Sequence, residues 1–181
     1  MLNKLSVLIV TFLLVPFLSS LAQEKTFSYI GTEACGMCHK SEKQGQQLSI
    51  WKNSKHAQAY NTLKTEKADE IAKNAGYETP AAETEACLKC HVSGYNVDPS
   101  LLGKKFKIED GVQCETCHGP GSEYKSMKIM KSREESIANG LIVHENLEDF
   151  CTNCHNNESP TFVEFNFAEQ WEKIKHPVPE K

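Results

Sequence analysis

The chain has 181 residues, a formal net charge of −4 at pH 7 and 39% hydrophobic residues. Asp and Glu outnumber Lys and Arg by 24 to 20, so the broad basic surface of a nucleic-acid-binding protein is excluded and no nucleic-acid partner is expected. The length suits one domain, and no linker or low-complexity block divides residues 23–181.

Residues 1–22 have the pattern of a secretory signal peptide. Lys4 gives a positive start, Leu5 to Leu18 is an apolar run, and Ser20 and Ala22 are the small residues of a cleavage site. We therefore expect export to the periplasm. An uncleaved anchor is the alternative, because the apolar run approaches the length of a membrane span, and membrane association is expected only in that case.

Helical patterns dominate the remaining chain. They cover residues 49–75, with Gly76 as a stop, residues 123–138, which end before Asn139 and Gly140, and residues 165–175, which end before Pro177. Residues 78–85 and 94–103 have the composition of loops, and strand-like alternation is confined to 106–108 and 141–143. The sequence predicts a mainly α fold with little strand.

One pattern, Cys-x-x-Cys-His, occurs four times and uses all eight cysteines. It is the attachment signature of c-type haem: two thiols one helical turn apart bond to one porphyrin, and the next histidine binds its iron. The uneven spacing of the motifs argues against a repeat protein. The predicted attachment residues are Cys35, Cys38, Cys87, Cys90, Cys114, Cys117, Cys151 and Cys154, and the motif histidines are His39, His91, His118 and His155.

Paired cysteines also occur in zinc sites and in disulfides. Zinc sites contain Cys-x-x-Cys pairs but do not need a histidine directly after every pair. A disulfide framework is common in exported proteins, but four tight pairs would be an unusual one. Four covalently bound haem c groups are therefore the predicted cofactors. Without the signal segment and the cysteines, only about 30% of the chain is apolar, so haems are expected to form much of the core.

The chain has fewer candidate histidines for the second ligand position than it has predicted haem irons. Outside the motifs the histidines are His56, His144 and His176, and we predict that all three bind iron. Met127 and Met130 could complete a fourth pair but are interpreted as packing residues. An iron that lacks a sixth protein ligand can bind a small molecule.

Three stretches resemble the tetrahaem cytochrome c-554 family: "WKNSKHAQAYNTL" at residues 51–63, "CLKCHVSGY" around the second motif and "GVQCETCHGPGS" around the third. The resemblance runs from about residue 33 to about residue 178, and the order of motif and other histidines is similar to that family's. It implies a compact, mainly α multihaem cytochrome c fold with haems stacked in pairs.

The same resemblance implies the ligand pairs. His144 would bind the first iron opposite His39, His56 the third opposite His118, and His176 the fourth opposite His155. The second iron, on His91, would be five-coordinate and could take a small gas ligand. Relatives place a histidine within about ten residues of the third motif, where this chain has Tyr124 and Met127.

The family's role implies a periplasmic electron carrier between redox proteins that act as donor and acceptor, with hydroxylamine oxidation as the best-known setting. The alternatives are an enzyme that converts nitric oxide or a related nitrogen species at the open haem, a gas-binding sensory module, or a haem subunit of a larger redox complex. Four haems in so short a chain leave little room for a substrate pocket, which favours the carrier.

Overall fold

The structure is a computed structural model that describes residues 25–177, so the predicted signal peptide lies outside the described residues. The α-helices are α1 (Thr32–Gly36), α2 (Gln47–Lys52), α3 (Ala59–Leu63), α4 (Glu66–Asn74), α5 (Glu85–His91), α6 (Cys114–His118), α7 (Met127–Met130), α8 (Arg133–Ala138), α9 (Leu147–Thr152) and α10 (Phe167–Ile174). In place of strands, the described part has an isolated bridge between Tyr29 and Leu102. The predicted mainly α fold is confirmed.

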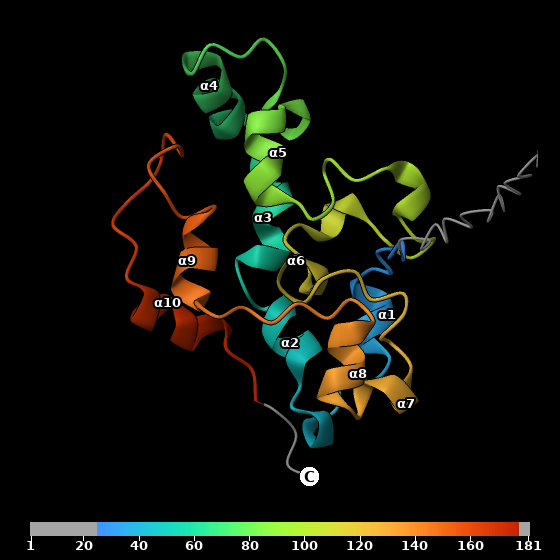
Figure 1. Cartoon of the computed structure of the whole chain (residues 1–181). Helices are drawn as coiled ribbons and strands as arrows, with labels where there is room; N and C mark the ends of the chain where they lie inside the picture. Colours follow the sequence, from blue (N-terminus) through green and yellow to red (C-terminus); the bar gives the residue numbers. More distant parts are fainter. Residues whose placement is uncertain (1–24, 178–181) are drawn as a thin grey trace, which may run out of the picture.

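The fold consists of short helices that are joined by loops (Figure 1). In that view α4 and α5 occupy one end, α1, α7 and α8 lie toward the other, and α9 and α10 form one flank. α1 packs against α2 and α6, α3 packs against α4 and α5, and α7 packs against α8. Among residues 25–177, none of the helices has the length and hydropathy that crossing a membrane requires.

The predicted helix over residues 49–75 is broken into several pieces. α2 ends at Lys52, where the Ser54 hydroxyl donates a hydrogen bond to the Trp51 carbonyl. A 3-10 turn at His56–Gln58 leads into α3. Thr65 then starts α4, because its hydroxyl accepts the N–H of Ala68 as an N-cap. Polar side chains that compete for backbone groups thus divide a stretch with helical composition.

The predicted helix over residues 123–138 is also divided. Ser126 caps α7 and Ser132 caps α8, each by accepting a backbone N–H three residues later. The end of α8 at Ala138 is as predicted. α10 lies within the predicted range and is capped by Asn166.

The protein side chains alone form a small apolar core. Leu63, Ala72 and Ala81 make one buried cluster, against which Tyr60 and Leu88 pack. This cluster supports α5, the helix of the second motif. The described residues also include large apolar side chains that are exposed, namely Met37, Tyr77, Tyr95, Met127, Met130, Ile137, Ile142, Val143, Leu147, Phe162 and Val163.

Candidate haem sites

Each Cys-x-x-Cys-His motif forms a helical turn. The second and third motifs lie within α5 and α6. In the first, the His39 N–H donates to the Cys35 carbonyl over 3.1 Å, and in the fourth the His155 N–H donates to the Cys151 carbonyl over 3.0 Å. These are i to i+4 bonds, so the two cysteines of a motif project from one side of the turn. That is the local geometry that attachment of one porphyrin through two thioethers needs.

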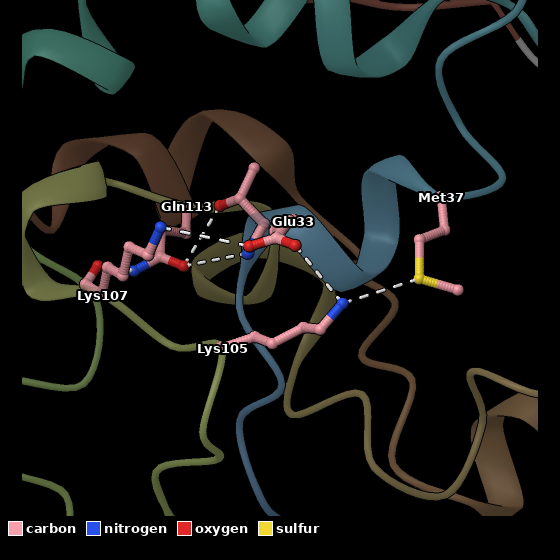
Figure 2. A network of polar contacts seen from close by, with 6 residues as sticks. Glu33, Met37, Lys105, Lys107 and Gln113 are labelled. Atoms are coloured by element: carbon pink, nitrogen blue, oxygen red, sulfur yellow. Dashed lines mark hydrogen bonds and ion pairs between the residues drawn. The ribbon is translucent and has the colours of Figure 1, made fainter.

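Polar contacts fasten the first motif to the third. Thr32, in the first turn of α1, donates from both its backbone N–H and its hydroxyl to the side-chain oxygen of Gln113, at 3.3 and 3.1 Å. The Gln113 amide in turn donates to the Lys107 carbonyl at 2.8 Å. Figure 2 shows this network, with Glu33 paired to Lys105 at 3.3 Å. Gln113 is 2% exposed and directly precedes Cys114, so α1 and α6 are held in a fixed relation.

The sulfur atoms of different motifs also lie near one another. Cys35 and Cys114 are hydrogen-bonded, which raises the pKa of Cys35 and lowers that of Cys114. Burial, followed by the nearby Cys151, raises the pKa of Cys117 to about 11. Burial and the neighbouring Cys90 raise the pKa of Cys154 to about 12. The motifs are therefore adjacent in the order first, third, fourth, second.

An ion pair also joins the second motif to the segment after the fourth motif. Lys89, inside the second motif, pairs with Glu158 at 2.5 Å, just after the fourth motif. All eight cysteines are free thiols. In the part of the chain that the structure describes, no three His, Cys, Asp or Glu side chains converge as ligands of one metal ion would in a zinc site.

Four imidazoles meet in two pairs. The ring centroids of His56 and His155 are 6.1 Å apart and tilted by 57°. Those of His118 and His176 are 5.9 Å apart and tilted by 58°. Two imidazoles that bind one metal ion from opposite sides, each through a nitrogen about 2 Å away, have centroids about 6 Å apart. Both pairs therefore have the separation that an iron between two histidines requires.

Two site histidines are oriented through Nδ1. The Nδ1–H of His91 donates to the Ala59 carbonyl at 2.9 Å, and that of His176 donates to the Ile174 carbonyl at 3.2 Å. A carbonyl can only accept, so Nδ1 carries the proton and Nε2 has a lone pair for a metal. This is the usual outer contact of a metal-binding histidine.

Desolvation favours the neutral form of three of the paired imidazoles. It lowers the pKa of His56, with a smaller contribution from His155, and it lowers the pKa of His155 itself. Desolvation also lowers the pKa of His118, and the nearby His176, His144 and His39 lower it further. Only neutral imidazole can bind a metal, so the pKa shifts favour ligation.

The remaining predicted ligands are placed differently. The Nε2–H of His144 donates to the Cys117 carbonyl at 2.8 Å, and its ring stacks on Phe150 with a centroid distance of 3.9 Å. In the described part of the chain, no second imidazole stands about 6 Å from the ring of His39 or of His91. The structure thus brings together four of the seven predicted ligands.

These features fit covalently attached haem. Each helical turn presents two free thiols and one imidazole, and two of the motif histidines face a second imidazole at the correct separation. The exposed large apolar side chains are not members of the Leu63 cluster. A porphyrin beside each motif would also supply the apolar interior that the side chains lack.

A family model described as "Cytochrome c554 and c-prime" matches residues 34–119, which contain the first three motifs. The chain is 30% identical over 152 residues to cytochrome c-554 of Nitrosomonas europaea, an alignment that covers 76% of this chain and 61% of that protein. The chain belongs to the cytochrome c-554 family.

The solved structure of reduced cytochrome c554 from Nitrosomonas europaea has the same fold. It is 24% identical, with a TM-score of 0.52, and the match covers 82% of this chain and 79% of that one. Membership in a cytochrome c family makes haem c with iron the cofactor that the Cys-x-x-Cys-His motifs serve. This cytochrome c-554 family member spans 61% of the length of the curated relative.

The observed pairs differ from those that the resemblance implied. His56 faces His155 instead of His118, and His176 faces His118 instead of His155. His144 does not face His39. Chain order alone could not assign these pairs, because the motif nearest in sequence is not the one that is faced: His56 follows the first motif but faces His155, and His176 follows the fourth but faces His118.

Two polar residues that position this family member's motifs were not recognised from the sequence. Glu115 is 1% exposed, and its carboxylate accepts the backbone N–H groups of Ile30, Gly31 and Gly121. Gln113 orders α1, as described above. Both residues directly adjoin Cys114, which is a signal in the sequence, but a polar residue beside or inside a haem motif has no periodicity that predicts its burial.

Proposed function

We propose that this chain is an exported electron-transfer protein that carries four covalently attached haem c groups. Each Cys pair would hold one group, and the motif histidine would supply its first iron ligand. The single observation that carries the proposal is that two motif histidines, His118 and His155, each face a second imidazole at about 6 Å. Bound haem supplies reversible one-electron chemistry between ferrous and ferric iron.

The two facing pairs favour electron transfer over ligand chemistry at those sites. His118 with His176, and His155 with His56, would fill both axial positions of the third and fourth irons. A filled coordination sphere changes little between oxidation states, which suits rapid electron exchange. The lowered pKa values of His56 and His118 favour the neutral form, in which each imidazole would bind its iron.

The adjacency of the motifs supports a relay. The neighbouring sulfur atoms order the motifs first, third, fourth, second. The helix and side-chain contacts that hold those sulfurs would hold the attached groups in the same order, with the two doubly ligated sites in the middle. Electrons would therefore enter and leave at the first and second sites, and the partners would be periplasmic redox proteins that act as donor and acceptor.

A small-molecule redox enzyme is the second candidate function. His91 is oriented by the Ala59 carbonyl as a first ligand, and no second imidazole faces it among the described residues. Its iron could take nitric oxide or a related species. Turnover of nitric oxide by the reduced protein would favour this function, and binding without turnover would favour the carrier or a haem subunit of a larger complex.

Export and domain organisation complete the proposal. Residues 1–22 would be removed as a signal peptide, leaving residues 23–181 as one haem domain in the periplasm. Membrane association would follow only if the segment were retained. The acidic composition favours a basic docking surface on the partner.

The test combines a pyridine haemochrome assay with mass spectrometry of the purified protein. We expect a c-type spectrum, a mass increase of four haems and an N-terminus near Gln23. A protein that holds zinc, or one that has no covalent haem after expression with a haem-maturation system, would refute the proposal. Rapid oxidation by a basic cytochrome, without consumption of a small substrate, would support the carrier.

A further inference from the structure

Glu115 is a buried anion that connects two haem motifs. It is 1% exposed and lies in α6, inside the third motif. Both carboxylate oxygens accept backbone N–H groups: Oε1 from Ile30 at 2.8 Å and Gly121 at 2.7 Å, and Oε2 from Ile30 at 3.0 Å and Gly31 at 2.8 Å. A backbone N–H cannot accept, so a protonated oxygen would have no partner here, and the side chain is bound as a carboxylate.

No cation neutralises this charge. In the described part of the chain, no Lys, Arg or His side chain forms an ion pair with Glu115, and the ion pairs that are present lie at the surface. The N–H groups stabilise the carboxylate but have no net charge themselves. A negative charge that is shielded from water acts over a longer range than an exposed one, because solvent and salt screen it less.

The carboxylate is close to the attachment residues of both motifs. Gly31 directly precedes α1, which contains Cys35, and Glu115 directly follows Cys114. The hydrogen bond between the two thiols raises the pKa of Cys35 and lowers that of Cys114, and the nearby charge of Glu115 acts to raise the pKa of both. None of the Glu115 hydrogen bonds uses a sulfur or an imidazole nitrogen, so haem attachment does not compete with them.

We propose that the charge of Glu115 lowers the reduction potentials of the first and third haems, which are attached through Cys35 and Cys114. This inference rests on the proposed haem-binding function. Reduction adds one electron, and therefore one negative charge, which a nearby carboxylate opposes. At an effective dielectric constant of about 20, two unit charges about 10 Å apart change a one-electron equilibrium on the order of tenfold.

The charge divides the four sites into two halves. In the fourth motif, desolvation and then Glu148 raise the pKa of Cys151, and in the second motif, desolvation and then Cys90 raise the pKa of Cys87. Glu115 contributes to neither shift, in contrast to its effect on the first and third motifs. The field of Glu115 therefore favours the movement of an electron from the first and third sites toward the fourth and second.

The experiment is a potentiometric titration of the holoprotein, followed by visible absorbance and by electron paramagnetic resonance of poised samples. In Glu115→Gln, two of the four midpoint potentials should rise and two should stay unchanged. A tenfold change in the ferrous-to-ferric ratio corresponds to a rise of about 59 mV for a one-electron couple. Fewer than two raised midpoints would contradict the inference.

A haemochrome assay of the wild-type protein separates this inference from the proposed function. Fewer than four haems in the wild type would contradict the proposed function. Four haems together with midpoints that Glu115→Gln leaves unchanged would contradict only the effect of the charge.

Two further variants separate the charge of Glu115 from its packing. Glu115→Asp keeps the charge but shortens the side chain, so its stability should fall while its midpoints stay near those of the wild type. A shift of the Asp midpoints would contradict the inference, even where the Gln variant assembles poorly. Loosening alone admits water, which stabilises the ferric form and lowers a potential, whereas loss of the charge raises it. Glu123→Gln removes an exposed charge and should leave all four midpoints unchanged; a shift equal to that of Glu115→Gln would show that net charge alone is responsible.

Discussion

The carboxylate of Glu115 accepts the backbone N–H of Gly121 at 2.7 Å, so a side chain from inside the third motif fixes the turn that follows it. The same carboxylate accepts the N–H groups of Ile30 and Gly31, each at 2.8 Å at its shorter contact. Because Gly31 directly precedes α1, one buried anion connects the entrance to the first motif with the exit from the third. Backbone N–H groups stabilise such a carboxylate without a cationic side chain.

Replacing this carboxylate should destabilise the holoprotein. Glu115→Gln removes the charge and places an amide NH2 among N–H donors, which leaves buried donors unsatisfied. We expect a loss of about 2–4 kcal/mol in the free energy of unfolding, measured by denaturant titration followed by circular dichroism. Glu123→Gln is the control, because Glu123 is exposed. Equal stability of the two variants would show that the carboxylate contacts contribute nothing.

Glu115 also illustrates what the sequence could predict. The four motifs, the helical class and the position of α10 follow from spacing and periodicity, which are local properties of the chain. The contacts of Glu115 with residues 84 and 85 positions away are not local. The breaks at Ser54 and Thr65 depend on hydrogen bonds that composition does not reveal, and the pairing of histidines depends on how separate motifs pack.

The two histidine pairs predict the outcome of double substitutions. Residues that share an iron should perturb one haem together, whereas residues on different irons should perturb two. His56→Ala with His155→Ala should therefore remove one low-spin signal, and His56→Ala with His118→Ala should remove two. Electron paramagnetic resonance counts the signals, after mass spectrometry has confirmed four haems in each variant. The reverse result would restore the pairing that the family resemblance implied.

Three histidines with lowered pKa values make stability depend on pH. Burial lowers the pKa of His56, His118 and His155 below the ordinary 6.5. Between each lowered value and 6.5 the unfolded chain binds protons that the folded chain does not, so the free energy of unfolding falls as the pH decreases through this window. Unfolding by denaturant at a series of values from about pH 7.5 to about pH 5 should show the decline. A constant free energy across the series would contradict it.

Gly119 should tolerate a side chain less well than Gly76. Gly119 has φ 76° and ψ 169°, and a Cβ there would lie 2.5 Å from the Gly140 carbonyl oxygen. Gly76 has φ 90°, but a Cβ there would meet no atom within 4 Å. We expect Gly119→Ala to cost about 2–4 kcal/mol and Gly76→Ala about 1 kcal/mol, measured by thermal unfolding of the holoprotein.

The comparison of these two glycines tests the close approach of two chain segments. Both variants have a positive φ, so the difference reports the contact between the turn after the third motif and Gly140, together with the extra strain of the ψ of 169° at Gly119. Loss of that contact should also disturb the Tyr124 hydroxyl, which donates to the Gly119 carbonyl at 2.9 Å. Equal costs for the two substitutions would indicate that residues 119 and 140 separate freely.

The acidic charge predicts how the protein meets a redox partner. The chain has a net charge of −4, and the proposed removal of residues 1–22 would take away Lys4 without removing an acid, so the processed form would be more negative still. Haem propionates would add to this charge where they reach the surface.

Attraction to a basic partner raises the association rate at low ionic strength, and salt screens this attraction over a Debye length of about 8–10 Å near physiological ionic strength. We expect the second-order rate of electron exchange with a basic cytochrome, followed by stopped-flow absorbance, to fall at least several-fold as salt increases, and the rate with an acidic cytochrome to rise. Rates that do not change with salt would mean that docking depends on apolar contacts, for which exposed side chains such as Met127 and Val163 would be the first candidates.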